Sequence, residues 1–177
     1  TTHLLDRIAE ANGEKCVEVP VGFKWVSAKM EETNAIIGGE SSGGMAIRGR
    51  IKGKDGVYAA ALLAEMLAVT GKKMSAIYDG IRKDYGETAF VERNFRFRPE
   101  AKESFTRRIM EDKEIPALPF AVDHVSYMDG CKLYFRNGGW LSVRFSGTEP
   151  LLRVFAEMER REDAERVCEV YREFLQL

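Results

Sequence analysis

Residues 140–158 read WLSVRFSGTEPLLRVFAEM, two runs of strand-forming residues joined by a tight turn that contains Ser-Gly-Thr. In the first run, Leu141, Val143 and Phe145 alternate with other residues, which is typical of a strand that is buried on one face. The same alternation places Arg144 on the opposite face, away from the core. Two strands joined this tightly fix the local fold and carry an arginine to the edge of the turn.

The turn itself has the composition of an anion site. Gly147 is free to adopt a positive φ, so that successive backbone N–H groups converge on one concavity. The guanidinium groups of Arg144 and Arg153 then add charge-assisted hydrogen bonds, each contributing roughly 1.5–3 kcal/mol. A phosphate fits this arrangement, with Ser146 and Thr148 as further donors. The alternative is a structural hairpin turn with two surface arginines, and Glu149 either repels an anion or orients an arginine.

The second half of the chain, residues 87–177, is predicted to be an α+β domain because several consecutive strands are flanked by helices. A helix begins at Pro99, and a last amphipathic helix ends the chain. The helix's apolar face comprises Ala164, Val167, Cys168, Tyr171, Phe174 and Leu175. The strands are expected in 88–98, 121–128, 131–136, 140–145 and 151–158.

The first half, residues 1–86, alternates helix and strand, which favours an α/β domain with parallel strands. A helix that ends at Gly13 is followed by a short strand over 15–20 and a helix over 22–33. A strand that looks buried then runs into a glycine-rich loop. The next helix, after Asp55-Gly56, is apolar nearly all round and is expected to be well buried. A further helix ends at Gly86.

That glycine-rich loop, GGESSGGM at 38–45, lacks the Gly-Lys-Ser/Thr ending of a phosphate-binding P-loop. Glu40, Ser41 and Ser42 instead combine an acceptor carboxylate with hydroxyls that both donate and accept, which is the chemistry of sugar recognition. The alternative is a flexible connection. Lys24, at the start of the helix over 22–33, is either a further contact for an anion or a solvated surface lysine.

Composition excludes several other classes of function. The 27 basic and 28 acidic residues nearly balance, so no basic field exists for a nucleic-acid backbone. His3 and His124 have no metal-ligand or nucleophile partner at a telling spacing, and no catalytic residue or metal site is predicted. The odd number of cysteines indicates reduced thiols. No apolar run reaches membrane length and no signal peptide opens the chain, so we expect a cytoplasmic protein without membrane contact.

The three motifs VGFKW (21–25), GGESSGG (38–44) and RFSGTEPLLRV (144–154) occur in this order in a chain that closely resembles the last two domains of the α-D-phosphohexomutases, the phosphoglucomutase/phosphomannomutase family. The resemblance implies an α/β third domain over 1–86, whose loop binds the sugar through Glu40, Ser41 and Ser42, with Lys24 facing the ligand. It implies a fourth, TATA-binding-protein-like domain over 87–177. The residues implied to grip the substrate phosphate are Arg144, Ser146, Gly147, Thr148 and Arg153.

The resemblance also implies parts that these 177 residues do not contain. Family members carry a phosphorylated serine in the first domain and an Asp-rich Mg²⁺ loop in the second, and no residues here correspond to either. We therefore expect a C-terminal fragment that is inactive alone, with Mg²⁺ and the reacting phosphoserine in N-terminal domains of the same chain. The rival hypothesis is a non-catalytic phosphosugar-binding module.

The family reaction moves phosphate between C1 and C6 of a hexose through a bisphosphorylated sugar that turns over in the site. Gly44 stands where many dual-specificity members have histidine. The residues around VGFKW and at Phe145 differ from those usual in glucosamine enzymes. Both features favour glucose or mannose phosphates as substrates over glucosamine phosphate, without separating glucose from mannose.

Overall fold

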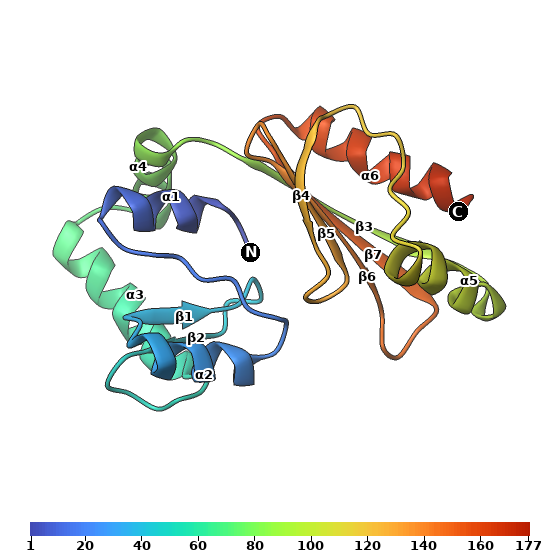
Figure 1. Ribbon diagram of the computed structural model, residues 1–177. Helices are drawn as coiled ribbons and strands as arrows, with labels where there is room; N and C mark the ends of the chain where they lie inside the picture. The colour runs from blue at the N-terminus through green and yellow to red at the C-terminus, as the bar shows by residue number, and fades with distance from the viewer. The chain divides into compact units, whose positions relative to one another are not determined.

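A computed structural model describes all of residues 1–177, and the chain divides into two compact units, Thr1–Glu87 and Thr88–Leu177. Each unit is described by itself (Figure 1). The first unit consists of α1 (Leu4–Ala11), α2 (Phe23–Thr33), β1 (Ile37–Gly39), β2 (Met45–Ile47), α3 (Gly56–Thr70) and α4 (Met74–Tyr85).

The helices of the first unit begin and end at the residues that the sequence indicates. The Asp55 carboxylate caps α3 by accepting the backbone N–H of Tyr58 at 2.9 Å. Gly71 ends the same helix in the left-handed conformation, with φ of 64°. Gly13 has the same conformation just beyond α1, with φ of 71°. These local signals confirm the predicted helices.

The sheet of the first unit differs from the expectation. Its only strand pair is β1 with β2, and the pairing is antiparallel because the five intervening residues are too few for a crossover connection. The strand predicted over 15–20 does not form, since no neighbouring strand pairs with it. The expected buried strand is short and exposed, with Ile37 at 56%.

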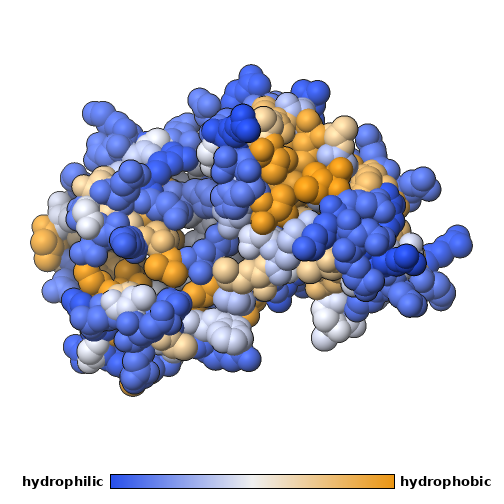
Figure 2. Space-filling view, in the orientation of Figure 1, coloured by the Kyte–Doolittle hydropathy of each residue, from blue (hydrophilic) through white to orange (hydrophobic).

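Helix α3 also departs from the prediction, because none of its residues is buried within this chain. Val57 is 84% and Val69 79% exposed, and Figure 2 shows hydrophobic side chains gathered around this helix. An apolar helix becomes buried only where other elements pack around it. The elements of residues 1–87 cover α3 only in part, since Leu62 and Met66 are half-buried and no residue of the helix is fully buried. The prediction that α3 is well buried is therefore wrong for this chain.

The second unit is a five-stranded antiparallel sheet in the order β3-β7-β6-β5-β4, with α6 along one side (Figure 1). The helix predicted from Pro99 forms as three successive pieces, a 3₁₀ turn, an α-helical turn and a π-helical turn. The elements are β3 (Ala89–Arg96), η1 (Pro99–Ala101), α5 (Lys102–Thr106), η2 (Arg107–Glu111), β4 (Val122–Ser126), β5 (Cys131–Phe135), β6 (Trp140–Phe145), β7 (Leu151–Met158) and α6 (Arg161–Leu175).

The core of this unit lies between one sheet face and α6. Leu141 and Val143 of β6 are almost fully buried, as the alternation predicts, and so are Leu152 and Val154 of β7. The helix contributes its predicted apolar face, including Tyr171, whose hydroxyl lies 3.8 Å from the Cys131 sulfur. Burial of this face fixes which side chains of β6 and β7 point outward.

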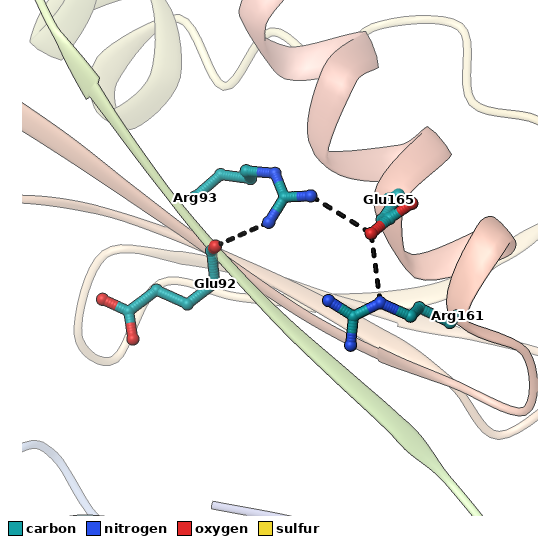
Figure 3. Close-up of polar contacts among 4 residues, drawn as sticks. All are labelled: Glu92, Arg93, Arg161 and Glu165. Carbon is teal, nitrogen blue, oxygen red and sulfur yellow. Dashed lines mark hydrogen bonds and ion pairs between the residues drawn. The ribbon is translucent and has the colours of Figure 1, made fainter.

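A small charged cluster closes the edge of the core where β3 passes α6 (Figure 3). Arg93 of β3 and Arg161 of α6 both donate to Oε1 of Glu165, each at 3.2 Å. Arg93 also donates to the backbone carbonyl of Glu92 at 3.1 Å. Because these side chains are partly exposed, each pair contributes about 1 kcal/mol or less.

Leu152→Ala tests the core. The substitution removes a fully buried side chain from the centre of the sheet, so it should lower the free energy of unfolding of this unit by about 2–5 kcal/mol. Urea unfolding followed by the fluorescence of buried Trp140 measures the change. The control is Met128→Ala, at an exposed loop position of the same unit, which should change stability by less than about 0.5 kcal/mol. Equal effects of the two substitutions would contradict the described core.

Thiol labelling tests the burial of the cysteines. Cys16 is exposed, whereas Cys131 and Cys168 are buried. Burial raises the pKa of the Cys168 thiol to about 12 and also raises the pKa of Cys131, so neither forms the reactive thiolate near pH 8. One equivalent of an alkylating reagent should react in the native protein, at Cys16, and three after denaturation. Rapid native labelling of Cys168, located by mass spectrometry, would contradict this.

Candidate functional site

Arg144 and Arg153 lie directly opposite each other on adjacent strands. The register of β6 with β7 pairs them at the end of the hairpin, next to the pair formed by Phe145 and Leu152. Because the residues that flank them point into the core, both arginine side chains point to the other face of the sheet. Like charges in such a cross-strand pair destabilise the sheet, and an anion bound between them would remove the repulsion.

Arg144 has a partner that sequence reasoning missed. Its Nε lies 3.3 Å from Oδ1 of Asp129, in the turn between β4 and β5, and the two side chains are 39% and 29% exposed. Gly130, next in the turn, has φ of 83°, and a Cβ there would lie 2.5 Å from the carbonyl oxygen of Val143. Only glycine allows this turn to lie so close to β6, which holds Asp129 beside Arg144.

Arg153 is exposed and forms no ion pair in the structure. Its guanidinium group is thus free to meet an anion, whereas Arg144 is held by Asp129 at the neighbouring position. Arg144 is not enclosed in an internal ion pair, because part of its side chain is open to solvent. The site therefore offers one oriented and one free guanidinium group.

The turn at 146–148 is organised by the Ser146 side chain and not, as expected, by the conformation of Gly147. Ser146 is largely buried, and its Oγ accepts the backbone N–H groups of Thr148 and Glu149, both at 3.4 Å. Gly147 does not have a positive φ, so the predicted glycine-dependent turn is wrong. The serine hydroxyl takes over its role because a side-chain acceptor two and three residues back organises the turn in ordinary φ. The two N–H groups therefore converge on the Ser146 hydroxyl, which accepts both of them.

Two further charges surround this turn. Lys102, at the start of α5, approaches the carbonyl oxygen of Ser146, with Nζ 3.5 Å away. The Glu149 carboxylate lies 3.8 Å from Arg96 and pairs with neither Arg144 nor Arg153. Glu149 therefore does not orient either arginine of the pair. Lys102 has no sequence signal of its own, because only the fold brings residue 102 next to residue 146.

In the first unit, the predicted sugar loop is the connection between β1 and β2. The backbone N–H of Glu40 donates to the carbonyl oxygen of Gly44 at 2.9 Å. The backbone N–H of Gly43 donates to the carbonyl oxygen of Glu40 at 3.0 Å. Ser41 and Ser42 are exposed at the tip, and neither hydroxyl has a partner. Glu40 Oε2 lies 2.6 Å from Nζ of Lys54.

Lys24 lies apart from these contacts. It is exposed in the first turn of α2, and its ammonium group stands over the ring of its neighbour Trp25, 4.9 Å from the centroid. The ring of Phe23, one residue earlier, is instead 5.5 Å from the Lys54 ammonium group. Lys54 therefore contacts the loop, whereas no contact joins Lys24 to it.

Residues 1–177 contain no group of three or more His, Cys, Asp and Glu side chains that could hold a metal ion. The acidic residues of both loops are engaged singly, Glu40 by Lys54 and Glu149 by Arg96. No helix combines the length and apolar character needed to cross a membrane.

Comparison with known families matches both units. Residues 1–85 match the family described as phosphoglucomutase/phosphomannomutase, alpha/beta/alpha domain III, and residues 100–173 match the phosphoglucomutase/phosphomannomutase C-terminal domain. These matches confirm the expected class, an α/β domain followed by a TATA-binding-protein-like α+β domain.

Individual relatives of the chain carry names from the same family. A phosphoglucomutase/phosphomannomutase from Thermococcus kodakarensis is 33% identical over 96% of this chain and 35% of its own length. A phosphoglucosamine mutase from Methanococcus maripaludis is 27% identical over 93% of this chain and 35% of its own. The crystal structure of a family protein from Burkholderia thailandensis aligns with a TM-score of 0.71 at 25% identity, over 97% of this chain and 34% of that chain. The chain thus spans about a third of the length of these relatives.

Ser146→Ala tests the turn. It removes the acceptor of two backbone N–H groups in a largely buried position, so we expect a loss of about 1 kcal/mol of stability. Amide hydrogen exchange should become faster at Thr148 and Glu149 and stay unchanged in β5. Ser146→Thr, which keeps the hydroxyl, is the control. Unchanged exchange at both amides in Ser146→Ala would show that the hydroxyl does not organise the turn.

Proposed function

Because the chain belongs to the phosphoglucomutase/phosphomannomutase family, we propose that it is the C-terminal part of a phosphohexomutase. The whole enzyme interconverts hexose 1-phosphate and hexose 6-phosphate through a bisphosphorylated sugar. In this proposal the present residues bind substrate, while the reacting phosphoserine and the Mg²⁺ ion belong to domains outside these 177 residues. The relatives, about three times as long as the chain, support this division.

The observation that carries the proposal is the cross-strand pair of Arg144 and Arg153 beside the turn at Ser146. The two guanidinium groups provide several donors and positive charge for a dianionic phosphate. No acidic side chain neutralises Arg153. We assign the phosphate contacts to Arg144, Ser146, Gly147, Thr148 and Arg153.

The sugar contacts are assigned to the loop of the first unit. Ser41 and Ser42 present unpartnered hydroxyls, and Glu40 has one carboxylate oxygen, Oε1, without a partner. Hexose hydroxyls both donate and accept, so these groups complement them. Lys24 is retained as a contact for the ligand only through the family resemblance, since in this structure its ammonium group stands over Trp25.

A fixed phosphate site with a separate sugar loop suits a reaction in which the intermediate must turn over. The phosphate that is not reacting is held by the arginines, and binding energy from this remote contact positions the other end of the sugar. The same contacts serve in both orientations because each end of the intermediate carries a phosphate. We propose glucose or mannose phosphates as substrates; relatives named phosphoglucosamine mutases make glucosamine phosphate the alternative.

Alanine substitution of Arg144 and of Arg153 tests the proposal in the longer protein that carries this chain. Each substitution removes a charged hydrogen bond to phosphate, so kcat/KM for glucose 1-phosphate should fall roughly 10- to 150-fold. Stability should change little because both side chains are partly or fully exposed. The control is Arg136→Ala, an exposed arginine in the turn before the opposite end of β6, which should leave kcat/KM unchanged.

The isolated 177 residues should bind glucose 6-phosphate without converting glucose 1-phosphate into it. Turnover above background by this chain would refute the assignment of catalysis to other domains. If Arg144→Ala and Arg153→Ala behave like Arg136→Ala in a folded, active enzyme, the arginine pair is not the phosphate site. A longer protein that binds phosphosugars but never isomerises them would instead be a non-catalytic module.

A further inference from the structure

We propose that Lys54 is a positioning residue for the sugar loop: it fixes the Glu40 carboxylate and fills the space above Gly44. This inference rests on the proposed function, because it assigns Glu40 to the substrate. Lys54 belongs to none of the three motifs. It lies in sequence ten residues after the loop, immediately before the cap of α3.

The first observation is the ion pair itself. Lys54 Nζ lies 2.6 Å from Oε2 of Glu40, and the Glu40 side chain is only 19% exposed, whereas that of Lys54 is 50% exposed. The contact occupies one carboxylate oxygen and leaves Oε1 directed elsewhere. A charge-assisted bond at this distance restricts the rotation of the carboxylate, so that Oε1 meets a ligand hydroxyl in one orientation.

The second observation is that Gly44 and Lys54 share one volume. A Cβ at position 44 would lie 2.6 Å from Cδ and 2.8 Å from Cε of Lys54. Gly44 does not have a positive φ, so its backbone does not require glycine. What glycine provides here is room, and the lysine stem uses it to reach Glu40 across the base of the loop.

The third observation is that Lys54 is also held by a contact with α2 and by the backbone hydrogen bonds of the residue that follows it. Its ammonium group stands over the ring of Phe23, 5.5 Å from the centroid, in the first turn of α2. The next residue, Asp55, caps α3 and donates its backbone N–H to the carbonyl oxygen of Met45 at 3.5 Å. The lysine therefore starts from a backbone that is tied both to α3 and to β2, which directly follows the loop.

A half-exposed ion pair by itself contributes little to stability, so the expected effect is on the loop and not on folding. Without Lys54, Glu40 keeps its backbone hydrogen bonds to Gly43 and Gly44 but loses the contact that orients its side chain. Substrate binding should weaken, because the carboxylate would then have to be ordered when the sugar binds. The chemical step, performed elsewhere, should change less.

The experiment uses Lys54→Met, Gly44→Ala and the double variant in the longer protein. Lys54→Met should raise KM for hexose phosphate about 10-fold with a smaller change in kcat. Gly44→Ala should have a similar effect, because the new methyl group displaces the lysine stem. The double variant should be no worse than either single variant, since both remove the same contact. Lys54→Arg should restore part of the binding.

Lys52→Met is the matched control. Lys52 lies two residues earlier and also forms an ion pair, at 2.7 Å with Glu31 of α2, but it does not contact the sugar loop. This variant should leave KM unchanged. If Lys52→Met and Lys54→Met have equal effects, or if the effects of Gly44→Ala and Lys54→Met add, the proposed positioning role is overturned.

A structural readout separates this inference from the proposed function. In amide NMR spectra of the 177 residues, Lys54→Met and Gly44→Ala should shift the resonances of Glu40 and Gly43, and Lys52→Met should not. Unmoved loop resonances overturn the role of Lys54 whatever the activity. A wild-type enzyme with no mutase activity overturns the proposed function, while shifted loop resonances would still support Lys54 as the residue that fixes Glu40.

Discussion

The register between β6 and β7 is the constraint on which the second unit depends. The pairing that buries Val143 against Val154 also places Arg144 opposite Arg153. A slip of one residue would turn the arginines into the core and the valines into solvent, at the cost of most of the buried apolar surface. Core burial thus forces two like charges together. The candidate phosphate site follows directly from the packing of the sheet.

The surroundings of the arginine pair moderate this local conflict without removing it. Asp129 balances one guanidinium group, held there by a turn that only Gly130 allows to approach β6. Glu149 is turned toward Arg96, so the second guanidinium group keeps its charge uncompensated. Local rules that are broken in an otherwise consistent domain are typical of functional positions. This is the physical reason to assign a ligand here and not merely a tight turn.

Sequence patterns predicted the features that depend on nearby residues. The alternation in β6, the apolar face of α6 and the start of a helix after Asp55-Gly56 are visible within a few residues and formed as expected. Features that depend on distant segments were missed or wrong. Residues 15–20 need a strand partner, and α3 needs neighbours to bury it, so composition alone could not decide either. Asp129, Lys102 and Lys54 reach the two loops only through the fold.

The two loops are stabilised by different means, and this difference bears on specificity. The turn at Ser146 is fixed by strand register and by hydrogen bonds within the turn itself, two of which the Ser146 hydroxyl accepts. The carboxylate of Glu40 is instead held by the long side chain of Lys54, 14 residues later in the sequence. Under the proposed function, exchanging the residues at positions 44 and 54 would alter the sugar contacts and leave the phosphate contacts intact. Such a separation would let the preference for one sugar change while the phosphate contacts stay constant, because specificity is a difference between the affinities of competing ligands.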